Sequence, residues 1–400
     1  MVDVKCCRLG DVADLIRGVS YKPSDLLSQG DSDSLPLLRA TNIGGRVLEL
    51  SDFVYVPAEF VRPDQLLKKF DIVIAMASGS KAAVGRLAQL RQNWTGGTGS
   101  FCAVIRAKDR LVEPEYLGYV TLSPEFRNRI ETYAQGTAIM NLSHNDLMGF
   151  TLELPVLSDQ RAIAGVLGAL DDKIESNRRI WKTALQLISV ARANAASVEV
   201  THLKSLGQLA DFNLNTTRPG PSEDKIVYID IASVTPGSIE KRQVVTWGDA
   251  PSRARREVRD GDLIFSTVRP GRRSFAVILN PEPRTVVSTG FAVMTPKNCG
   301  TSFLAAVIAD EEFADYCENV AQGSAYPAVS PEAMSRFEVE VPSVEALDKF
   351  ESMYLPILRR GDRAQAENVI LSNMRDALLP ELLSGRLRVR DAEKVVEGAV

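Results

Sequence analysis

The sequence predicts an α+β protein in which one structural unit is written twice. Residues 134–155 recur 187 positions later as residues 321–342, and 8 of the 22 positions are identical without a gap. Average composition would give roughly one or two identities by chance. Each copy ends in a proline that precedes a long stretch with helical spacing of apolar residues. We therefore expect two repeated mixed α/β domains joined by two long helices that form an antiparallel coiled coil.

The duplication extends through the globular parts. Leu9–Asp14 is echoed by Leu206–Asp211, Phe70–Ile74 by Gly261–Phe265, and Ser100–Ile105 by Thr289–Met294. The offset drifts from 197 to 187, as small loop insertions and deletions would produce. We expect a first globular domain at 1–155, a central helix at 156–197, a second globular domain at 198–342, a C-terminal helix at 343–388 and a tail at 389–400.

Short runs rich in Val, Ile, Phe and Tyr, bounded by turn residues, predict the strands. In the first copy these runs are 35–43, 52–56, 71–77, 101–106 and 150–154, and in the second they are 226–234, 243–247, 262–268, 274–279, 286–294 and 337–341. Shorter helices are expected near 114–132 and 302–320.

The first long helix is expected to start after Pro155, with Ser158 as its N-cap, and to run for about 38 residues without a proline. Its apolar residues alternate at spacings of four and three, which is a heptad seam. This seam contains Ile163, Leu167, Leu170, Ile174 and Trp181. Asn177 is a polar seam position, and a buried asparagine would fix the register of the two helices.

The second long helix follows Pro342 and carries Leu371, Leu378 and Leu382 on its seam. Pro356 lies inside it and is expected to kink or split it, while Pro380 and Gly385 should mark its end. Neither helix can bury its apolar stripe alone. We therefore expect the two to pack together as a spacer between the globular domains. The alternative is two independent core helices.

Composition argues against a catalytic or metal-binding chain. The sequence holds only two histidines and no Cys-x-x-Cys motif, phosphate-binding lysine loop, S-adenosylmethionine loop or adenine-methylation motif. We therefore expect no enzymatic activity and no metal or cofactor on this chain. Five scattered cysteines, a start without secretion-signal character and the lack of a membrane-spanning apolar run favour a cytoplasmic location. The net charge of −4 means that any DNA contact depends on local basic patches.

The clearest basic patch lies in the second copy, where seven arginines fall between 253 and 273. Arginine forks match phosphate oxygens and the major-groove edge of guanine. The candidates are Arg255, Arg256, Arg269, Arg272 and Arg273. The matching place in the first copy holds Ser80, Lys81 and Arg86. The alternative is a solvated surface with ion pairs.

A second loop type precedes the last strand of each copy. It reads Gln135, Gly136 and Thr137 in the first copy and Gln322, Gly323 and Ser324 in the second. Glycine allows close backbone approach to a ligand, and hydroxyl groups can donate to phosphate. A structural turn is the alternative. Arg39 and Asn42, near the end of an early strand, are weaker candidates for DNA contact.

Two helical motifs resemble a known family. The segment from Asp159-Gln160-Arg161 through Leu170-Asp171 to Asn177 resembles the central conserved region of DNA-specificity subunits of type I restriction–modification systems. The segment from Met374-Arg375-Asp376 to Gly385 resembles their C-terminal conserved region. The resemblance spans essentially the whole chain, including the duplication. In the second helix Leu347 replaces the glutamine that would match Gln160, so the pseudo-symmetry is imperfect.

The resemblance implies that each globular domain is a target-recognition domain for one half of a split double-stranded DNA site. The two helices would set the gap between the half-sites. Two methyltransferase subunits, which bind S-adenosylmethionine and methylate adenine N6, would dock on the helices, and a restriction subunit could join them. A coiled-coil scaffold that joins proteins without DNA specificity is the alternative.

Overall fold

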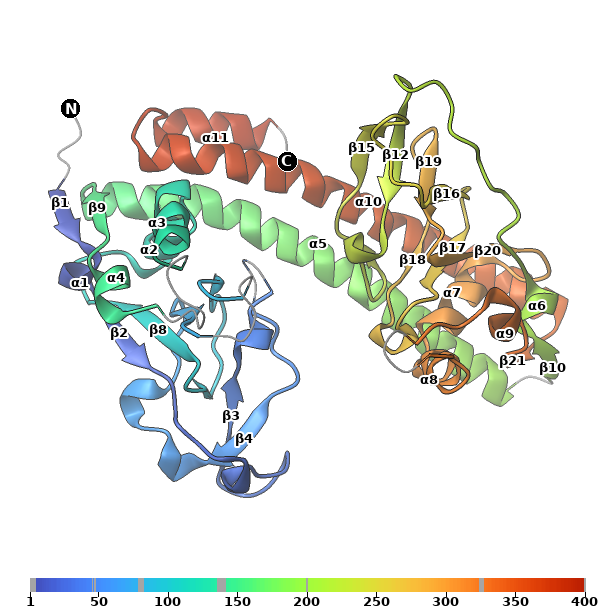
Figure 1. Ribbon diagram of the computed structural model, residues 1–400, viewed down its shortest axis with the longest axis horizontal. Coiled ribbons are helices and arrows are strands. Elements are labelled where there is room, and N and C mark those ends of the chain that lie inside the picture. The colour runs from blue at the N-terminus through green and yellow to red at the C-terminus, as the bar shows by residue number, and fades with distance from the viewer. Residues whose placement is uncertain are drawn as a thin grey trace. The chain divides into compact units, whose positions relative to one another are not determined.

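The computed structural model describes residues 5–44, 46, 48–77, 83–134, 142–198, 201–323 and 327–398. The chain divides into two compact units, Met1–Lys173 with Ile370–Val400, and Ile174–Val369. We call them unit 1 and unit 2 and describe each by itself. Two long helices, α5 (Leu157–Val198) and α10 (Val344–Leu383), contribute residues to both units (Figure 1).

Unit 1 is built on two small sheets. A four-stranded antiparallel sheet has the order β2-β8-β5-β6, and a three-stranded sheet has the order β4-β3-β7. All four side chains of β5 are buried, as its unbroken apolar run requires. The strands are β2 (Ala13–Arg17), β3 (Ser34–Leu38), β4 (Val54–Pro57), β5 (Ile72–Ala75), β6 (Leu87–Gln89), β7 (Gly97–Thr98) and β8 (Cys102–Ala107).

Helices and a strand pair complete unit 1. Strand β1 (Lys5–Arg8) pairs antiparallel with β9 (Thr151–Leu154), so the two ends of the globular part close on each other. Ser143 accepts a hydrogen bond from the backbone N–H of Asp146 and caps the short helix α4. The helices are α1 (Leu9–Val12), α2 (Pro114–Thr121), α3 (Pro124–Ala134) and α4 (His144–Met148), with single turns η1 (Pro23–Asp25), η2 (Ala40–Asn42), η3 (Ala58–Phe60) and η4 (Pro63–Gln65).

Unit 2 repeats this plan. Its sheet β11-β20-β17-β18 has the same strand order as the four-stranded sheet of unit 1, and β10 pairs with β21 as β1 pairs with β9. A second sheet has the order β15-β12-β19-β16, and β13 pairs with β14. The strands are β10 (His202–Ser205), β11 (Ala210–Phe212), β12 (Lys225–Ile229), β13 (Val234–Thr235), β14 (Ser238–Ile239), β15 (Gln243–Thr246), β16 (Ala254–Glu257), β17 (Leu263–Ser266), β18 (Phe275–Val277), β19 (Thr285–Ser288), β20 (Phe291–Pro296) and β21 (Glu338–Val341).

Four short helices cover unit 2, namely α6 (Leu206–Leu209), α7 (Thr301–Ala309), α8 (Glu311–Asn319) and α9 (Pro331–Ser335), together with turns η5 (Ile231–Ser233) and η6 (Pro270–Arg272). Almost every residue of α7 is buried, because this helix lies in the main core of the unit. The expected single strand at 286–294 was wrong. It is two strands, β19 and β20, because the chain turns at Thr289-Gly290 and changes sheets.

The long helices pair antiparallel in unit 2. Asn177 of α5 donates to Glu367 of α10 at 2.8 Å, whereas Trp181, one turn further along α5, contacts Gly361, which lies earlier in α10. In unit 1, Asp171 of α5 forms an ion pair with Arg375 of α10 at 2.6 Å. The predicted seam residues Ile163, Leu167, Leu170, Ile174, Asn177, Trp181, Leu371, Leu378 and Leu382 are all buried. The predicted α+β fold with two long paired helices is confirmed.

Two local expectations for these helices were wrong. The expectation that Pro356 splits the helix was wrong, because buried Phe350 and Leu358 hold α10 on both sides of it and offset the loss of one backbone hydrogen bond. A kink at Pro356 stays a prediction. Ser158 is not the N-cap of α5, since the helix already begins at Leu157. Gly385, with φ of 69°, follows the end of α10 as predicted. The segment after it forms a further helix, α11 (Val389–Glu397).

Candidate nucleic-acid interface

In unit 2, the two predicted loop types meet at one place. The loop after β17 and the loop before α9 are joined by backbone hydrogen bonds, from Val329 N–H to the Thr267 carbonyl at 2.9 Å and from Arg269 N–H to the Pro327 carbonyl at 2.8 Å. Gln322 and Ala328 also exchange two hydrogen bonds of 2.9 Å across the base of the second loop. The basic loop and the Gln-Gly-Ser loop therefore emerge from a single backbone junction.

Unit 1 has the same junction. The backbone N–H of Leu142 donates to the carbonyl of Met76 at 3.0 Å, at the positions that match Val329 and Thr267 in the repeat. These residues directly flank the two loops proposed from the sequence. Ser80, Lys81, Gln135, Gly136 and Thr137 lie outside the described residues, as does Ser324 in unit 2. Of the remaining loop candidates, Arg86, Gln322 and Gly323 are exposed.

The arginine loop of unit 2 has a fixed backbone. Arg269 and Arg273 both adopt left-handed conformations, with φ of 51° and 55°, on either side of η6. Gly271 lies against α8, because an added Cβ would be 2.5 Å from a carboxylate oxygen of Glu318. Arg273 donates to the Glu311 carboxylate and to the Ala309 carbonyl, both at 2.7 Å. Arg273 thus anchors the loop to the adjacent helices.

Arg272 differs from its neighbour Arg273. Its side chain is exposed, and within the described residues it forms no hydrogen bond or ion pair. The loop backbone around it is held by the Arg273 anchor and by the Arg269–Pro327 hydrogen bond. An exposed guanidinium on a rigid loop is well suited to a phosphate or a base edge.

Arg255 and Arg256 lie on β16 at a bulge in its pairing with β19. The Arg255 guanidinium lies 5.9 Å from the ring centroid of Trp247 and also donates to the Ala254 carbonyl at 2.7 Å. Arg256 is half-buried, and its Nε has no hydrogen-bond partner in the described part of the chain. Burial lowers the pKa of Arg256. An anion brought to this side chain would offset the cost of burying its charge.

The weaker candidates in unit 1 have mainly local partners. Asn42 is buried, and its amide accepts from Arg39 N–H at 2.8 Å and donates to the carbonyls of Glu49 and Ser51 at 3.0 and 2.6 Å. Arg39 forms an ion pair with Asp52 at 2.7 Å and also donates to the Asp52 carbonyl. In this geometry Asn42 shapes the loop that follows β3, and Arg39 is the more accessible of the two.

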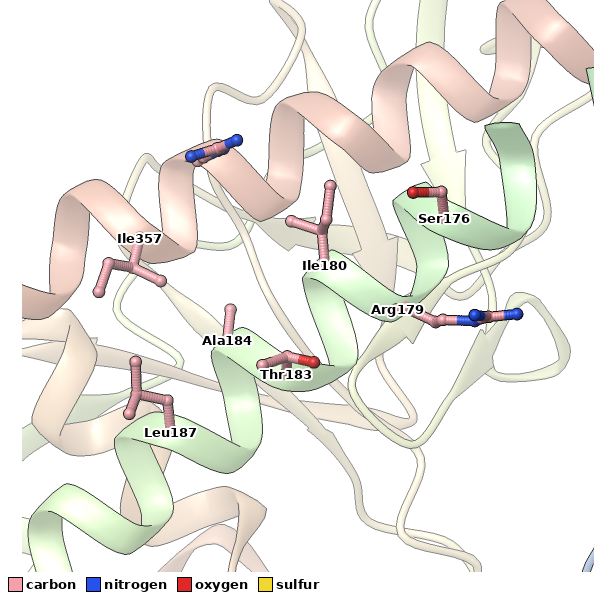
Figure 2. Close-up of a pocket in the computed structure, with 8 residues that line it drawn as sticks. Ser176, Arg179, Ile180, Thr183, Ala184, Leu187 and Ile357 are labelled. Atoms are coloured by element: carbon pink, nitrogen blue, oxygen red, sulfur yellow. The ribbon is translucent and has the colours of Figure 1, made fainter. Parts of the chain in front are cut away.

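A groove runs between the long helices of unit 2 and has a volume of about 390 Å³. Figure 2 shows Ile180 and Ala184 pointing from α5 toward α10, with Ile357 of α10 pointing back. Leu187, 42% exposed, extends this apolar strip. Arg179 and Arg360 line its rim and are exposed. The groove therefore has an apolar floor and a basic rim.

Residues 1–184 match the type I restriction modification DNA specificity domain. A curated relative, the specificity subunit of the type I restriction enzyme StySPI from Salmonella potsdam, is 35% identical over 190 residues, which are 48% of this chain and 41% of that protein. The EcoKI specificity subunit of Escherichia coli K12 is 29% identical over 275 residues, 64% of this chain and 59% of that protein. The matches thus cover about half the length of these relatives.

The structural comparison extends beyond the specificity domain. The crystal structure of the type I restriction–modification S subunit from M. genitalium superposes with a TM-score of 0.51 at 16% identity, covering 95% of this chain and 96% of that one. This likeness shows a shared fold over both units. The family resemblance predicted from the two helical motifs is confirmed, and these relatives are named as specificity subunits, not as scaffolds.

Sequence reasoning missed a charged network between the specificity domain and the end of α10. Asp171 accepts hydrogen bonds from Arg375 at 2.6 Å and from the Tyr119 hydroxyl at 2.7 Å, and Arg91 lies 3.7 Å away. Arg375 also contacts Asp376, which pairs with Arg46 at 3.0 Å. The helical motifs contained Asp171, Arg375 and Asp376, but no sequence pattern linked them to Arg91, Tyr119 or Arg46.

Metal-binding clusters and reactive cysteines were the other kinds of site considered for the described residues. None of their His, Cys, Asp and Glu side chains form a cluster that could hold a metal ion. Burial raises the pKa of the thiols of Cys102, Cys299 and Cys317 to about 12, which keeps them protonated and poorly nucleophilic. No helix in the described ranges has both the length and the apolar character to cross a bilayer.

Proposed function

We propose that this chain is the DNA sequence-specificity subunit of a type I restriction–modification complex, in which each unit reads one half of a bipartite DNA site. The observation that carries the proposal is the backbone junction found twice, joining Met76 to Leu142 and Thr267 to Val329. Each junction holds together two loops that the sequence singled out for basic, glycine and hydroxyl residues. A rigid scaffold that presents such loops in duplicate suits the reading of two half-sites.

The charges of the chain support a few local DNA contacts and not a broad basic surface. With a net charge of −4, the chain has no general attraction to DNA. Arg272 is exposed on a fixed loop, and Arg256 lacks an acidic partner in the described residues. We assign these two side chains to the DNA contact of the second half-site. Arg255 adjoins Arg256 on β16, and the loop junction links the segments of Arg269, Gln322 and Gly323. We include these four residues in the proposed surface, while Arg273 holds the loop in place.

The proposed partners supply the chemistry. Two methyltransferase subunits, carrying S-adenosylmethionine, would methylate adenine N6 at sites that this chain selects, and a restriction subunit could join the complex. The chain itself would be non-catalytic and cytoplasmic. The proposed division remains two recognition domains at 1–155 and 198–342, with spacer helices at 156–197 and 343–388.

The groove in Figure 2 supports a docking role for the helices. Ile180, Ala184 and Ile357 offer an apolar floor, while the exposed Arg179 and Arg360 give a positive rim. We propose that a helix of the methyltransferase partner, apolar on one face and acidic at its edges, occupies this groove. A Leu187→Glu substitution would place a charge in the apolar strip and should weaken capture of the methyltransferase without unfolding the chain.

The proposed function is tested by co-expression with a type I methyltransferase subunit and mapping of N6-methyladenine across the host genome. We expect a two-part motif with a fixed non-specific gap. A stable complex that methylates nothing and binds DNA without salt sensitivity would instead favour the scaffold alternative. Methylation by the purified chain alone would contradict the non-catalytic assignment.

A further inference from the structure

Phe101 is an exposed aromatic side chain at the loop junction of unit 1. It lies in the turn between β7 and β8 and is 67% exposed, the highest fraction among the large apolar residues of the described chain. Single exposed apolar side chains are common on protein surfaces, so exposure alone assigns no role. The position of Phe101 relative to the two proposed DNA loops is the informative feature.

The backbone of Phe101 forms part of that junction. Its carbonyl accepts hydrogen bonds from the backbone N–H groups of Met76 at 2.8 Å and Ala77 at 3.2 Å. Ala77 is the last described residue before the loop that holds Ser80 and Lys81. The Met76 carbonyl in turn accepts from Leu142, which follows the loop that holds Gly136 and Thr137. Phe101 is therefore fixed at the point from which both loops leave the scaffold.

Unit 2 has the same backbone arrangement but no side chain at this place. Gly290 matches Phe101 in the repeat, and its carbonyl accepts from the Thr267 N–H at 2.8 Å and from the Thr267 hydroxyl at 2.9 Å. A Cβ added to Gly290 would lie 2.4 Å from Cδ1 of Ile231. In unit 2 the Ile231 side chain therefore occupies the space that a side chain at position 290 would enter.

The residues opposite these positions explain the difference. Ile231 begins η5, and the matching first residue of η2 in unit 1 is Ala40. Ala40 has only a methyl group where unit 2 has the longer Ile231 side chain. If Phe101 merely replaced the volume of Ile231 in the interior, it would be buried, but two thirds of its surface is exposed. Packing does not account for an aromatic residue here.

We propose that Phe101 contacts a nucleobase of the half-site read by unit 1, through its ring face or through the methyl group of a thymine. The inference rests on the proposed function. An exposed aromatic ring whose backbone is fixed at the junction of the two proposed DNA loops has the chemistry of base contact. Because Gly290 offers no such group, the contact exists in one half-site only.

The test compares Phe101→Ala, Phe101→Tyr and the control Leu111→Ala in the complete methyltransferase complex. Leu111 is also in unit 1 and is 50% exposed, so its truncation removes a similar apolar surface away from the junction. Binding to duplexes with the mapped motif is measured, and the methylated motif of each variant is sequenced.

We expect Phe101→Ala to weaken binding about 5- to 100-fold, the range of a lost base–aromatic contact. It should also relax one base position in the half-site that Arg272→Ala leaves unaffected. Phe101→Tyr should keep both properties, and Leu111→Ala should match the wild type. Replacing thymine by deoxyuridine in that half-site then separates the two modes, since only a methyl contact is lost.

Two results would overturn the inference. They differ in whether the proposed function also fails. If the wild-type complex gives a bipartite motif and Phe101→Ala keeps both its affinity and its motif, the base contact is wrong while the proposed function stands. If the wild-type complex has no bipartite motif, both fail together. Equal thermal unfolding of Phe101→Ala and wild type shows that any loss of binding is not a loss of fold.

Discussion

The indole N–H of Trp181 donates to the backbone carbonyl of Gly237 at 2.6 Å. Trp181 belongs to α5, whereas Gly237 lies in the turn between β13 and β14, so a residue of the long helix is bonded to the sheet region of unit 2. The ring also packs against Gly361 of α10, where an added Cβ would be 2.5 Å from Cε3. Trp181 therefore joins both long helices and the globular part of unit 2 in one core.

Gly361→Ala should destabilise the protein, although alanine is the better helix former. The new methyl group would overlap the Trp181 ring, and such overpacking costs about 1–3 kcal/mol. Gly165→Ala is the matched control, because Gly165 is also helical and its added Cβ meets nothing within 4 Å. It should instead gain about 0.5–1 kcal/mol. Thermal unfolding of both variants tests this, and a melting temperature of Gly361→Ala at or above wild type would contradict it.

The sequence places a glycine, Gly361, within the second long helix but does not show which residue packs against it. The seam residues of α5 were predictable, because heptad spacing depends only on local sequence. The role of Gly361 could not be predicted in this way, since its partner, Trp181, lies 180 positions earlier in the chain. Contacts between residues so distant in sequence leave no periodic signal. The same reason explains why the network around Asp171 was missed.

Arg375→Met should be strongly destabilising. The Arg375 side chain is 10% exposed and pairs with Asp171 at 2.6 Å, so its removal leaves a mostly buried carboxylate whose remaining ion-pair partner in the described residues, Arg91, is 3.7 Å away. Breaking a buried pair from one side costs about 3 kcal/mol. The expected loss is measured as the free energy of unfolding in urea.

Arg386→Met is the control for that pair. Arg386 lies on the same segment and pairs with Glu381 at 2.8 Å, but both side chains are well exposed. Solvent screening leaves little net stabilisation in such a pair, so this variant should unfold like wild type. Equal losses in the two variants would mean that burial of the Asp171–Arg375 pair is unimportant.

Asp262 should make the stability of unit 2 depend on pH. It is buried, and it accepts hydrogen bonds from Arg259 N–H and the Thr295 hydroxyl, both at 2.7 Å. Burial raises the pKa of Asp262, although these hydrogen bonds lower it in part. In unit 1 the matching Asp71 faces Arg106 at 2.6 Å, where unit 2 has Thr295.

The direction of this effect follows from proton binding. Because its pKa is raised, Asp262 holds its proton more tightly in the folded chain than in the unfolded chain, where aspartates titrate at ~3.9. Its contribution to stability is therefore fully present below that value and is lost as the pH rises through the raised pKa. The free energy of unfolding of wild type relative to Asp262→Asn should fall across this interval. Thr295→Arg supplies the missing cation and should reduce this change with pH. A difference in the free energy of unfolding between wild type and Asp262→Asn that does not change with pH would refute the prediction.

The arginine cluster shows how far sequence could define the proposed site. Clustering alone singled out Arg269, Arg272 and Arg273 together. It could not separate them, because Arg273 is anchored by Glu311 and Ala309, which lie beyond the loop in sequence. Phe101 was not singled out at all, since its exposure and its junction with Met76 exist only in the folded chain.

Arg272→Ala and Arg273→Ala should therefore change different properties, DNA binding in the first variant and thermal stability in the second. Arg272 is exposed without a partner in the described residues, so its removal should leave stability unchanged but weaken DNA binding by the complex. If it contacts a phosphate, the slope of log K against log salt should drop by about 0.9. Arg273→Ala should instead lower the melting temperature, because the loop loses its anchors on Glu311 and Ala309.

Arg336→Ala provides the matched control for both variants. Arg336 is an exposed arginine of unit 2 that pairs with Glu332 one helical turn away, outside the loop junction. It should match wild type in the salt slope and in thermal unfolding. Anisotropy titrations of labelled duplex at several salt concentrations give the slopes. If Arg272→Ala and Arg336→Ala bind DNA equally well, the Arg272 side chain is not in contact with DNA.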